Sequence, residues 1–324
     1  MRSAVYVLVA ALTALLLAAR AEGAPPSANP ARQPGLFAFE ALTGGIFTIH
    51  ADGTGGREIV PAGNNPEWSP DGTRLLYGLD GGLWSARSDG TDARSIVGSH
   101  LRGTAGGPCN IEFTVSDGAW SPSGRRVAFV GESEDENERS VHEICTASLD
   151  GSGIRKLRNG TEPEWIPGGR RIAFIAAAKS RRSFSSRIAT MRSDGRDVRV
   201  LLGDKKGYRQ SLDVSPDGRR LAFLETSSAP GWSPTVLRIM NLRTRRTRTI
   251  PWQRTGPRIN AVAWTPGGTR LAYLLTDLAL GQRVAPSSVF TIRPDGTGRK
   301  RLFTLPFEEH RGLWGEALSW QPPQ

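Results

Sequence analysis

Few residues of this 324-residue chain are arranged for catalysis. The sequence contains neither the G-x-S-x-G pattern of a serine nucleophile nor the H-E-x-x-H pattern of a zinc site. Its four histidines, which could act as bases or metal ligands, are widely separated: His50, His100, His142 and His310. A metal site needs several ligands to converge, and these histidines are scattered, so we predict no metal. Because the catalytic patterns are missing as well, we also predict no catalytic residue and no cofactor.

The first 24 residues have the pattern of a secretory signal peptide. Arg2 precedes an apolar run over residues 4–19, and small residues follow up to Ala24. The alternative is an uncleaved anchor, but this run is shorter than the roughly 20 residues of a membrane span. We therefore expect cleavage after Ala21 or Ala24, no stable membrane span afterwards, and a protein that is periplasmic or secreted.

The charge balance is strongly basic, with a formal net charge of +11 and a pI near 10.5. Inside a cell this balance would favour nucleic acid as a partner. Export argues against nucleic acid, so we expect an envelope protein or an anionic cell-wall or envelope ligand instead. We expect the protein itself to be a monomer.

Two interleaved repeats organise the rest of the chain. The first is a strand, a Pro-containing tight turn and a second strand, and it occupies residues 66–78, 118–130, 163–175, 212–224, 262–274 and, truncated, 317–324. The second is a pair of strands around an Asp-Gly turn, and it occupies residues 46–60, 83–97, 144–157, 188–202, 237–250 and 289–303. The copy at 237–250 replaces Asp-Gly with Leu242-Arg243-Thr244, so its register is less certain.

Together the repeats predict four-stranded antiparallel units with a period of about 50 residues. We predict an all-β, six-bladed β-propeller over residues 35–324, preceded by a linker over residues 25–34. A β-sandwich is the alternative, but it does not require the same two turns six times. The N-terminal part lacks a first strand and the C-terminal part has only that strand, so we expect both to share one composite blade that closes the ring.

With its turns at residues 68–72 (WSPDG) and 88–91 (SDGT), the chain resembles the TolB-like family of six-bladed propellers, a branch of the WD-type repeats. The resemblance covers residues 35 to 324 and implies the fold more than an activity. TolB itself carries an α/β domain before its propeller. Only about ten residues separate the signal peptide from the first strand here, so we expect that domain to be missing.

Loop lengths distinguish the two faces of the predicted disc. The turns within each repeat motif are short and must share one face, whereas the remaining loops are long and variable and share the other. We expect partners to bind the face with long loops, although loops that vary without constraint would look the same. Candidate anchors there are the tryptophans and the members of a basic sector: Trp232, Trp252, Trp314, Tyr208, Arg209, Arg181 and Arg182.

An acidic loop over residues 131–141 lies in a neighbouring blade and could orient a partner, or could simply be solvated. The same blade contains both cysteines of the chain, Cys109 and Cys145. Repeat alignment places Cys145 near the start of a third strand and Cys109 in the loop that enters the blade. In an exported protein we expect them to form a disulfide, the alternative being two isolated thiols.

The sequence thus favours an exported, non-catalytic propeller that binds a protein or a cell-envelope ligand. The alternative is a glycan-active hydrolase or lyase whose site lies at the mouth of the propeller channel.

Overall fold

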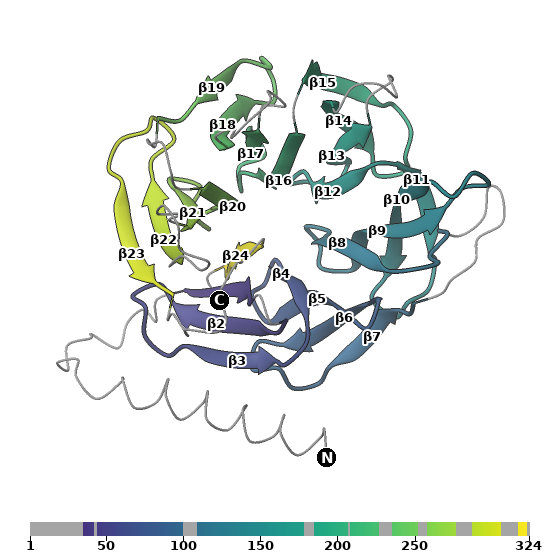
Figure 1. Ribbon diagram of the computed structural model, residues 1–324, viewed down its shortest axis with the longest axis horizontal. Coiled ribbons are helices and arrows are strands. Elements are labelled where there is room, and N and C mark those ends of the chain that lie inside the picture. Colours follow the sequence, from purple (N-terminus) through teal and green to yellow (C-terminus); the bar gives the residue numbers. More distant parts are fainter. Residues whose placement is uncertain are drawn as a thin grey trace.

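The computed structural model describes residues 35–41, 44–99, 109–177, 185–206, 208–226, 235–251, 258–276, 287–305 and 317–322. In these residues the chain forms six four-stranded antiparallel sheets arranged as a ring (Figure 1). The predicted six-bladed β-propeller is therefore confirmed. None of the described residues belongs to a helix long and apolar enough to cross a membrane.

The blades follow one another along the chain, each with its first strand nearest the axis. Blade one comprises β24 (Leu318–Trp320), β1 (Leu36–Glu40), β2 (Ile46–His50) and β3 (Arg57–Val60). Blade two comprises β4 (Asn64–Trp68), β5 (Arg74–Leu79), β6 (Gly82–Arg87) and β7 (Arg94–Val97). Blade three comprises β8 (Val115–Trp120), β9 (Arg126–Glu134), β10 (Ser140–Ser148) and β11 (Arg155–Asn159).

The remaining blades repeat this order. Blade four comprises β12 (Thr161–Trp165), β13 (Arg171–Ala177), β14 (Ser185–Arg192) and β15 (Arg199–Lys206). Blade five comprises β16 (Tyr208–Val214), β17 (Arg220–Thr226), β18 (Thr235–Asn241) and β19 (Thr247–Thr249). Blade six comprises β20 (Arg258–Trp264), β21 (Leu271–Thr276), β22 (Ser287–Ile292) and β23 (Lys300–Thr304).

The ring closes through blade one, as the truncated repeat predicted. β24 pairs antiparallel with β1, Phe37 opposite Trp320, and the backbone N–H of Gln321 donates to the carbonyl of Leu36 at 2.8 Å. The rings of Phe37 and Trp320 lie 4.2 Å apart between centroids. In Figure 1 the yellow β24 lies beside the purple strands of the chain's beginning. The first and last strands therefore form one sheet.

The repeated turns form because Asp side chains bind the backbone of the turn. In the first repeat Asp71 Oδ1 accepts the N–H of Thr73 at 3.1 Å, and Gly72 takes the positive φ of 68° that a side chain would disfavour. Asn241 substitutes for the missing Asp-Gly in blade five, where its Oδ1 accepts the N–H of Thr244 at 2.8 Å. The uncertain fifth copy is thus a regular hairpin.

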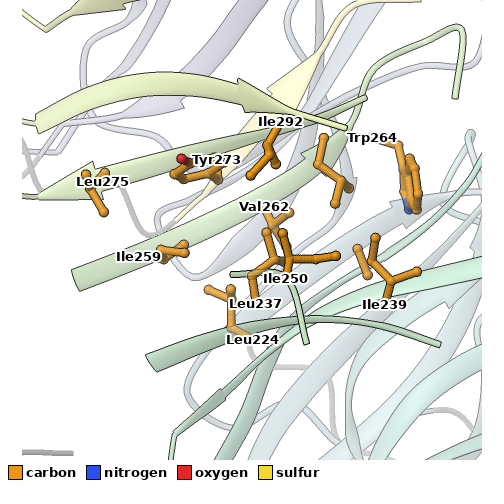
Figure 2. Close-up of a cluster of buried hydrophobic side chains, with 12 residues drawn as sticks. Leu224, Leu237, Ile239, Ile250, Ile259, Val262, Trp264, Tyr273, Leu275 and Ile292 are labelled. Carbon is orange, nitrogen blue, oxygen red and sulfur yellow. The ribbon is translucent and has the colours of Figure 1, made fainter. Parts of the chain in front are cut away.

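Packing between adjacent blades supplies the core. Between blades five and six, Leu224 and Leu237 face Ile259 and Val262 of β20 (Figure 2). Tryptophans recur at the end of the innermost strands and are almost fully buried: Trp68, Trp120, Trp165 and Trp264. This packing holds the innermost strands in place around the axis, where their polar side chains meet.

A candidate ligand site in the central channel

A cavity of about 430 Å³ lies where the innermost strands converge. Residues of all six, β4, β8, β12, β16, β20 and β24, line it. Its most prominent polar groups are carboxylates contributed by blades two to five: Glu67, Asp117, Glu162, Glu164 and Asp213. The site is therefore built from positions about 50 residues apart in the chain, one set per repeat.

A β-bulge in the innermost strands directs these side chains. In blades two to five the pairing with the second strand shifts register two to three residues before the strand's end. The residue inside each bulge has a left-handed backbone: Asn65 (φ 46°), Asp117 (48°), Glu162 (49°) and Ser211 (55°). Such a φ is uncommon for residues other than glycine. The bulge brings both Glu162 and Glu164 of blade four into the cavity lining.

Most of these carboxylates also bind the backbone of the next blade. Glu67 accepts the N–H of Trp120 at 3.3 Å, and Glu162 accepts that of Leu212 at 2.9 Å. Asp117 accepts the N–H of Glu162 at 3.2 Å, and Asp213 accepts the N–H of Trp264. They hold adjacent blades together at the axis, a role that Ser319 plays in blade one by accepting the N–H of Trp68 at 3.0 Å.

Glu164 differs from its neighbours. Among the residues that the structure describes, no group donates a hydrogen bond to its carboxylate. Burial raises its pKa well above the usual value, and repulsion by Glu67, Asp213, Glu162 and Asp117 raises it further. Glu164 is thus the carboxylate of the cavity that is left for a ligand.

Burial also raises the pKa of the other channel carboxylates. It raises the pKa of Glu67 and of Glu162 to about 8, and that of Asp213 to about 7. The pKa of Asp117 is raised by burial and by the charge of Glu132, while backbone hydrogen bonding partly opposes the shift. Within the described lining, Arg258 is the one cationic side chain. The cavity is therefore rich in carboxyl groups although the whole chain is basic, and with their pKa raised these groups are largely protonated near neutral pH.

On blade three the acidic lining continues to the protein surface. Glu132 lies at the end of β9 and His142 near the start of β10, with 3.7 Å between Oε1 and Nε2. Ser116 donates to the same Glu132 oxygen at 3.4 Å, and Asp117, the next residue, lines the cavity. This mouth of the channel therefore carries a carboxylate and a histidine that are both partly exposed.

The predicted disulfide is present, with 5.9 Å between the Cα atoms of Cys109 and Cys145. Both residues are buried, and Asn110 is also held, because its backbone N–H donates to Glu143 at 3.0 Å. Within the described residues, three metal-ligand side chains come close together at Cys109, Glu143 and Cys145, where both sulfurs are already used in the disulfide.

The predicted basic sector is only partly described. Tyr208 is half exposed, as a surface contact requires. Arg209 is buried instead, with 5% of its surface accessible; its Nε donates to Glu225 at 3.2 Å and its Nη1 to the carbonyl of Gly203 at 3.1 Å. Arg209 therefore stabilises the blade interior and presents no free guanidinium. The other predicted anchors lie outside the described residues: Trp232, Trp252, Trp314, Arg181 and Arg182.

The channel carboxylates are the site residues that sequence reasoning missed. Their signal was present in "PEW" at residues 66–68 and again at 163–165, where an acid directly precedes the buried tryptophan of an innermost strand. A charged side chain at such a position needs either a partner or water, and both conditions are met at a propeller axis.

No protein-family model matches this chain. No curated protein matches it either. Solved structures do, and one similar structure is TolB from Acinetobacter baumannii, with 17% sequence identity, a TM-score of 0.64, and coverage of 90% of this chain and 67% of that one. Another is the nidogen/laminin complex, with 16% identity, a TM-score of 0.61, and coverage of 89% and 98%.

An oligogalacturonate lyase in complex with manganese is also similar, with 15% identity, a TM-score of 0.52, and coverage of 86% of this chain and 74% of that one. At such identities a likeness establishes the fold and not the activity. The chain therefore has the six-bladed propeller fold of TolB, which confirms the resemblance carried by its turn motifs.

Proposed function

We propose that this protein is an exported, non-catalytic scaffold that binds a protein partner at the mouth of its central channel. The observation that carries the proposal is the 430 Å³ cavity on the axis, which is open to a ligand and lined by polar groups of several blades. The fold likeness to TolB and to the nidogen/laminin complex supports a propeller that serves as a binding scaffold.

The chemistry of the lining also favours binding over catalysis. Glu67, Glu162 and Asp213 already accept backbone N–H groups of the next blade. A carboxylate held in this way contributes to the ring itself and is less free to transfer a proton during turnover. Only Glu164 lacks such a bond within the described part of the chain.

The test is to fill the cavity without disturbing the blades. Ala317 lines the cavity just before β24, so Ala317→Trp would occupy it. Ser95→Trp, on the exposed outer strand β7, is the matched control. We expect wild-type protein and the Ser95 variant to capture the same proteins from a cell-envelope extract, quantified by mass spectrometry, and the Ala317 variant to lose them. Equal capture by all three would reject the channel as the binding site.

A glycan-active hydrolase or lyase is the second candidate, for one specific reason. The channel carboxylates have pKa values raised to about 7 or 8, in the range suited to a general acid or base near neutral pH. The Glu132–His142 pair lies at the adjacent mouth. Incubation with oligogalacturonates and with neutral oligosaccharides, followed by chromatography, tests this candidate: cleavage that disappears in Glu164→Gln would favour it over the scaffold.

A further inference from the structure

We infer that blade three presents a docking surface for a basic polypeptide segment that also carries apolar side chains. This inference rests on the proposed function, because it names the class of partner that would approach the channel. The surface, here called the acidic arm, consists of six carboxylates and one aromatic side chain: Glu112, Phe113, Glu132, Glu134, Asp135, Glu136 and Glu138.

Phe113 is the apolar part of the acidic arm. Its side chain is 52% exposed, and with Val200 and Tyr208 it forms the set of large apolar side chains that are exposed in the described residues. A single exposed phenylalanine in a mobile loop would carry little weight. Phe113, however, lies on a segment whose backbone is fixed at several points.

Hydrogen bonds hold that segment against β9. The backbone N–H groups of Glu112 and Phe113 both donate to the carbonyl of Glu132, at 2.9 and 3.2 Å, and Glu132 N–H donates back to Thr114 at 3.0 Å. At one end Val115 N–H donates to the carbonyl of Gly81 at 3.0 Å. The exposed ring is therefore presented on ordered backbone.

The disulfide fixes the other end. Cys109 is covalently bound to Cys145 of β10, and Ile111, between Cys109 and Phe113, is completely buried. A side chain that is ordered before binding loses less conformational entropy when a partner packs against it. The disulfide and the buried Ile111 therefore make Phe113 a preorganised anchor.

The charges around the anchor are of one sign. The β9–β10 hairpin exposes Glu134, Asp135, Glu136 and Glu138, and Glu112 accepts the N–H of Glu134 at 3.2 Å. The basic side chains at this end of the hairpin are Arg139, beside the turn, and His142, which lies 3.7 Å from Glu132. Carboxylates thus outnumber cations, and they surround the apolar anchor on its own blade.

The acidic arm is continuous with the channel. Glu132 belongs to the arm and accepts a hydrogen bond from Ser116, while Asp117 belongs to the cavity lining. A segment with lysine or arginine residues can therefore pair with the exposed carboxylates of the hairpin and extend to the edge of the cavity, with an apolar side chain on Phe113. Complementary charge of this kind steers a partner and fixes its orientation.

Fluorescence anisotropy with two labelled peptides, one of alternating lysine and leucine and one of alternating glutamate and leucine, tests the inference directly. We expect the lysine–leucine peptide to bind and the glutamate–leucine peptide not to bind. Binding of the lysine–leucine peptide should weaken at high salt. Glu134→Lys/Glu136→Lys should weaken binding by about tenfold or more. Glu58→Lys, a charge reversal on the outer strand β3 of blade one, should leave it within about twofold. Melting curves establish that each variant is folded.

A third peptide, of alternating lysine and serine, isolates the role of the anchor. Phe113→Ser should weaken the lysine–leucine peptide by about fivefold or more and leave the lysine–serine peptide unchanged. Equal binding by wild type and the double reversal variant, or no effect of Phe113→Ser, would overturn the inference. So would self-association that depends on the acidic arm, measured by sedimentation, because the occupant would then be a second copy of the chain.

The experiments distinguish an incorrect acidic arm from an incorrect channel site. If Ala317→Trp abolishes capture of the envelope partner while Glu134→Lys/Glu136→Lys does not, the channel is the binding site and the acidic arm is not.

Discussion

The innermost and outermost strands of the propeller differ in the ionisable side chains that they carry. Every outermost strand includes at least one basic residue: Arg57, Arg94, Arg155, Arg199, Arg248 and Lys300 mark β3, β7, β11, β15, β19 and β23. The innermost strands of blades two to five place carboxylates at the axis instead. Long cations on an outer edge discourage pairing with another sheet, whereas carboxylates at the axis bind the backbone of the next blade.

This contrast shows why net charge was a poor guide to the ligand. The value of +11 describes the whole chain, but much of the positive charge lies on the outer edges of the blades, where it is solvated and screened. A ligand in the channel meets the five carboxylates first. Because burial raises the pKa of Glu67 and Glu162 to about 8 and that of Asp213 to about 7, these groups are largely neutral near pH 7 and gain negative charge as the pH rises.

The largest expected effect comes from removing an innermost strand. Deleting residues 317–324 removes β24, which leaves β1 without its partner and Trp68 without the hydroxyl of Ser319. We expect the variant to lose its cooperative thermal transition or to aggregate, because an open sheet edge is exposed. Ser319→Ala, which removes one hydrogen bond, should cost only about 1 kcal/mol. A truncated protein that melts like the full-length chain would contradict the composite blade.

The next effect compares a buried inner arginine with an exposed outer one. Arg209→Ala, on β16, removes one cationic partner of buried Glu225, which also pairs with Arg238, and removing one member of a buried ion pair costs about 3–5 kcal/mol. Arg248→Ala, on β19, removes an exposed contact to the carbonyl of Asp295 and should change stability by less than about 0.5 kcal/mol. Chemical denaturation measures both. Equal losses of unfolding free energy in the two variants would show that the burial of Arg209 does not increase its contribution to stability.

The third effect comes from removing the disulfide, which tests whether binding at the acidic arm depends on that link. Cys109→Ala/Cys145→Ala opens a link across 36 residues and should lower the unfolding free energy by about 3–4 kcal/mol. Because the link orders the segment that carries Phe113, the same variant should bind the lysine–leucine peptide more weakly. Urea titration and anisotropy provide the two readouts. If the variant is less stable but binds the peptide with unchanged affinity, the acidic arm does not depend on the disulfide for binding.

The smallest effect is a dependence on pH that only the inner strands should show. Burial raises the pKa of Glu67 and Glu162 to about 8 and that of Asp213 to about 7, so the folded state binds these protons more tightly than the unfolded chain, where such groups titrate near about 4. The stability that these protonated groups contribute is fully present below about pH 4, and it is lost as the pH rises through 7 to 8.

Glu164→Gln removes one of the mutually repelling charges. We therefore expect a melting temperature that falls between mildly acidic and mildly alkaline buffer, and falls less in Glu164→Gln, with a difference of about 1 kcal/mol at alkaline pH. Glu58→Gln, on the outer strand β3, is the matched control and should follow the wild type. A wild-type melting temperature that rises over this interval would contradict the raised pKa values.

The repeats determined the fold because their information is local. A Pro-Asp-Gly turn between two short apolar runs specifies a hairpin wherever it occurs, as at Asp71 and Gly72. The position of the truncated repeat at residues 317–324 then required a composite blade. Cysteine pairing was expected because export permits disulfides, and the same alignment placed Cys109 and Cys145 at one end of one blade.

The site could not be predicted in the same way. Strand periodicity tells which side of its own sheet a residue occupies, but an innermost strand has neighbouring blades on its sides and the channel at its free edge. Which of these surrounds Glu67 or Arg209 depends on the bulges and on how the blades pack. For that reason Arg209 was expected at the surface and is buried, and the five carboxylates were not expected together.

The sequence by itself therefore determined the strands, the turns and the closure of the ring, since each depends on residues close in the chain or on a simple count of repeats. The disulfide, expected from export, is confirmed by the structure. Only the tertiary structure decided which side chains converge. Glu67, Asp117, Glu162 and Asp213 follow one another at separations of 50, 45 and 51 residues, and ring closure alone brings them to one axis. There burial raises their pKa, so a ligand near neutral pH meets carboxyl groups that can both donate and accept hydrogen bonds.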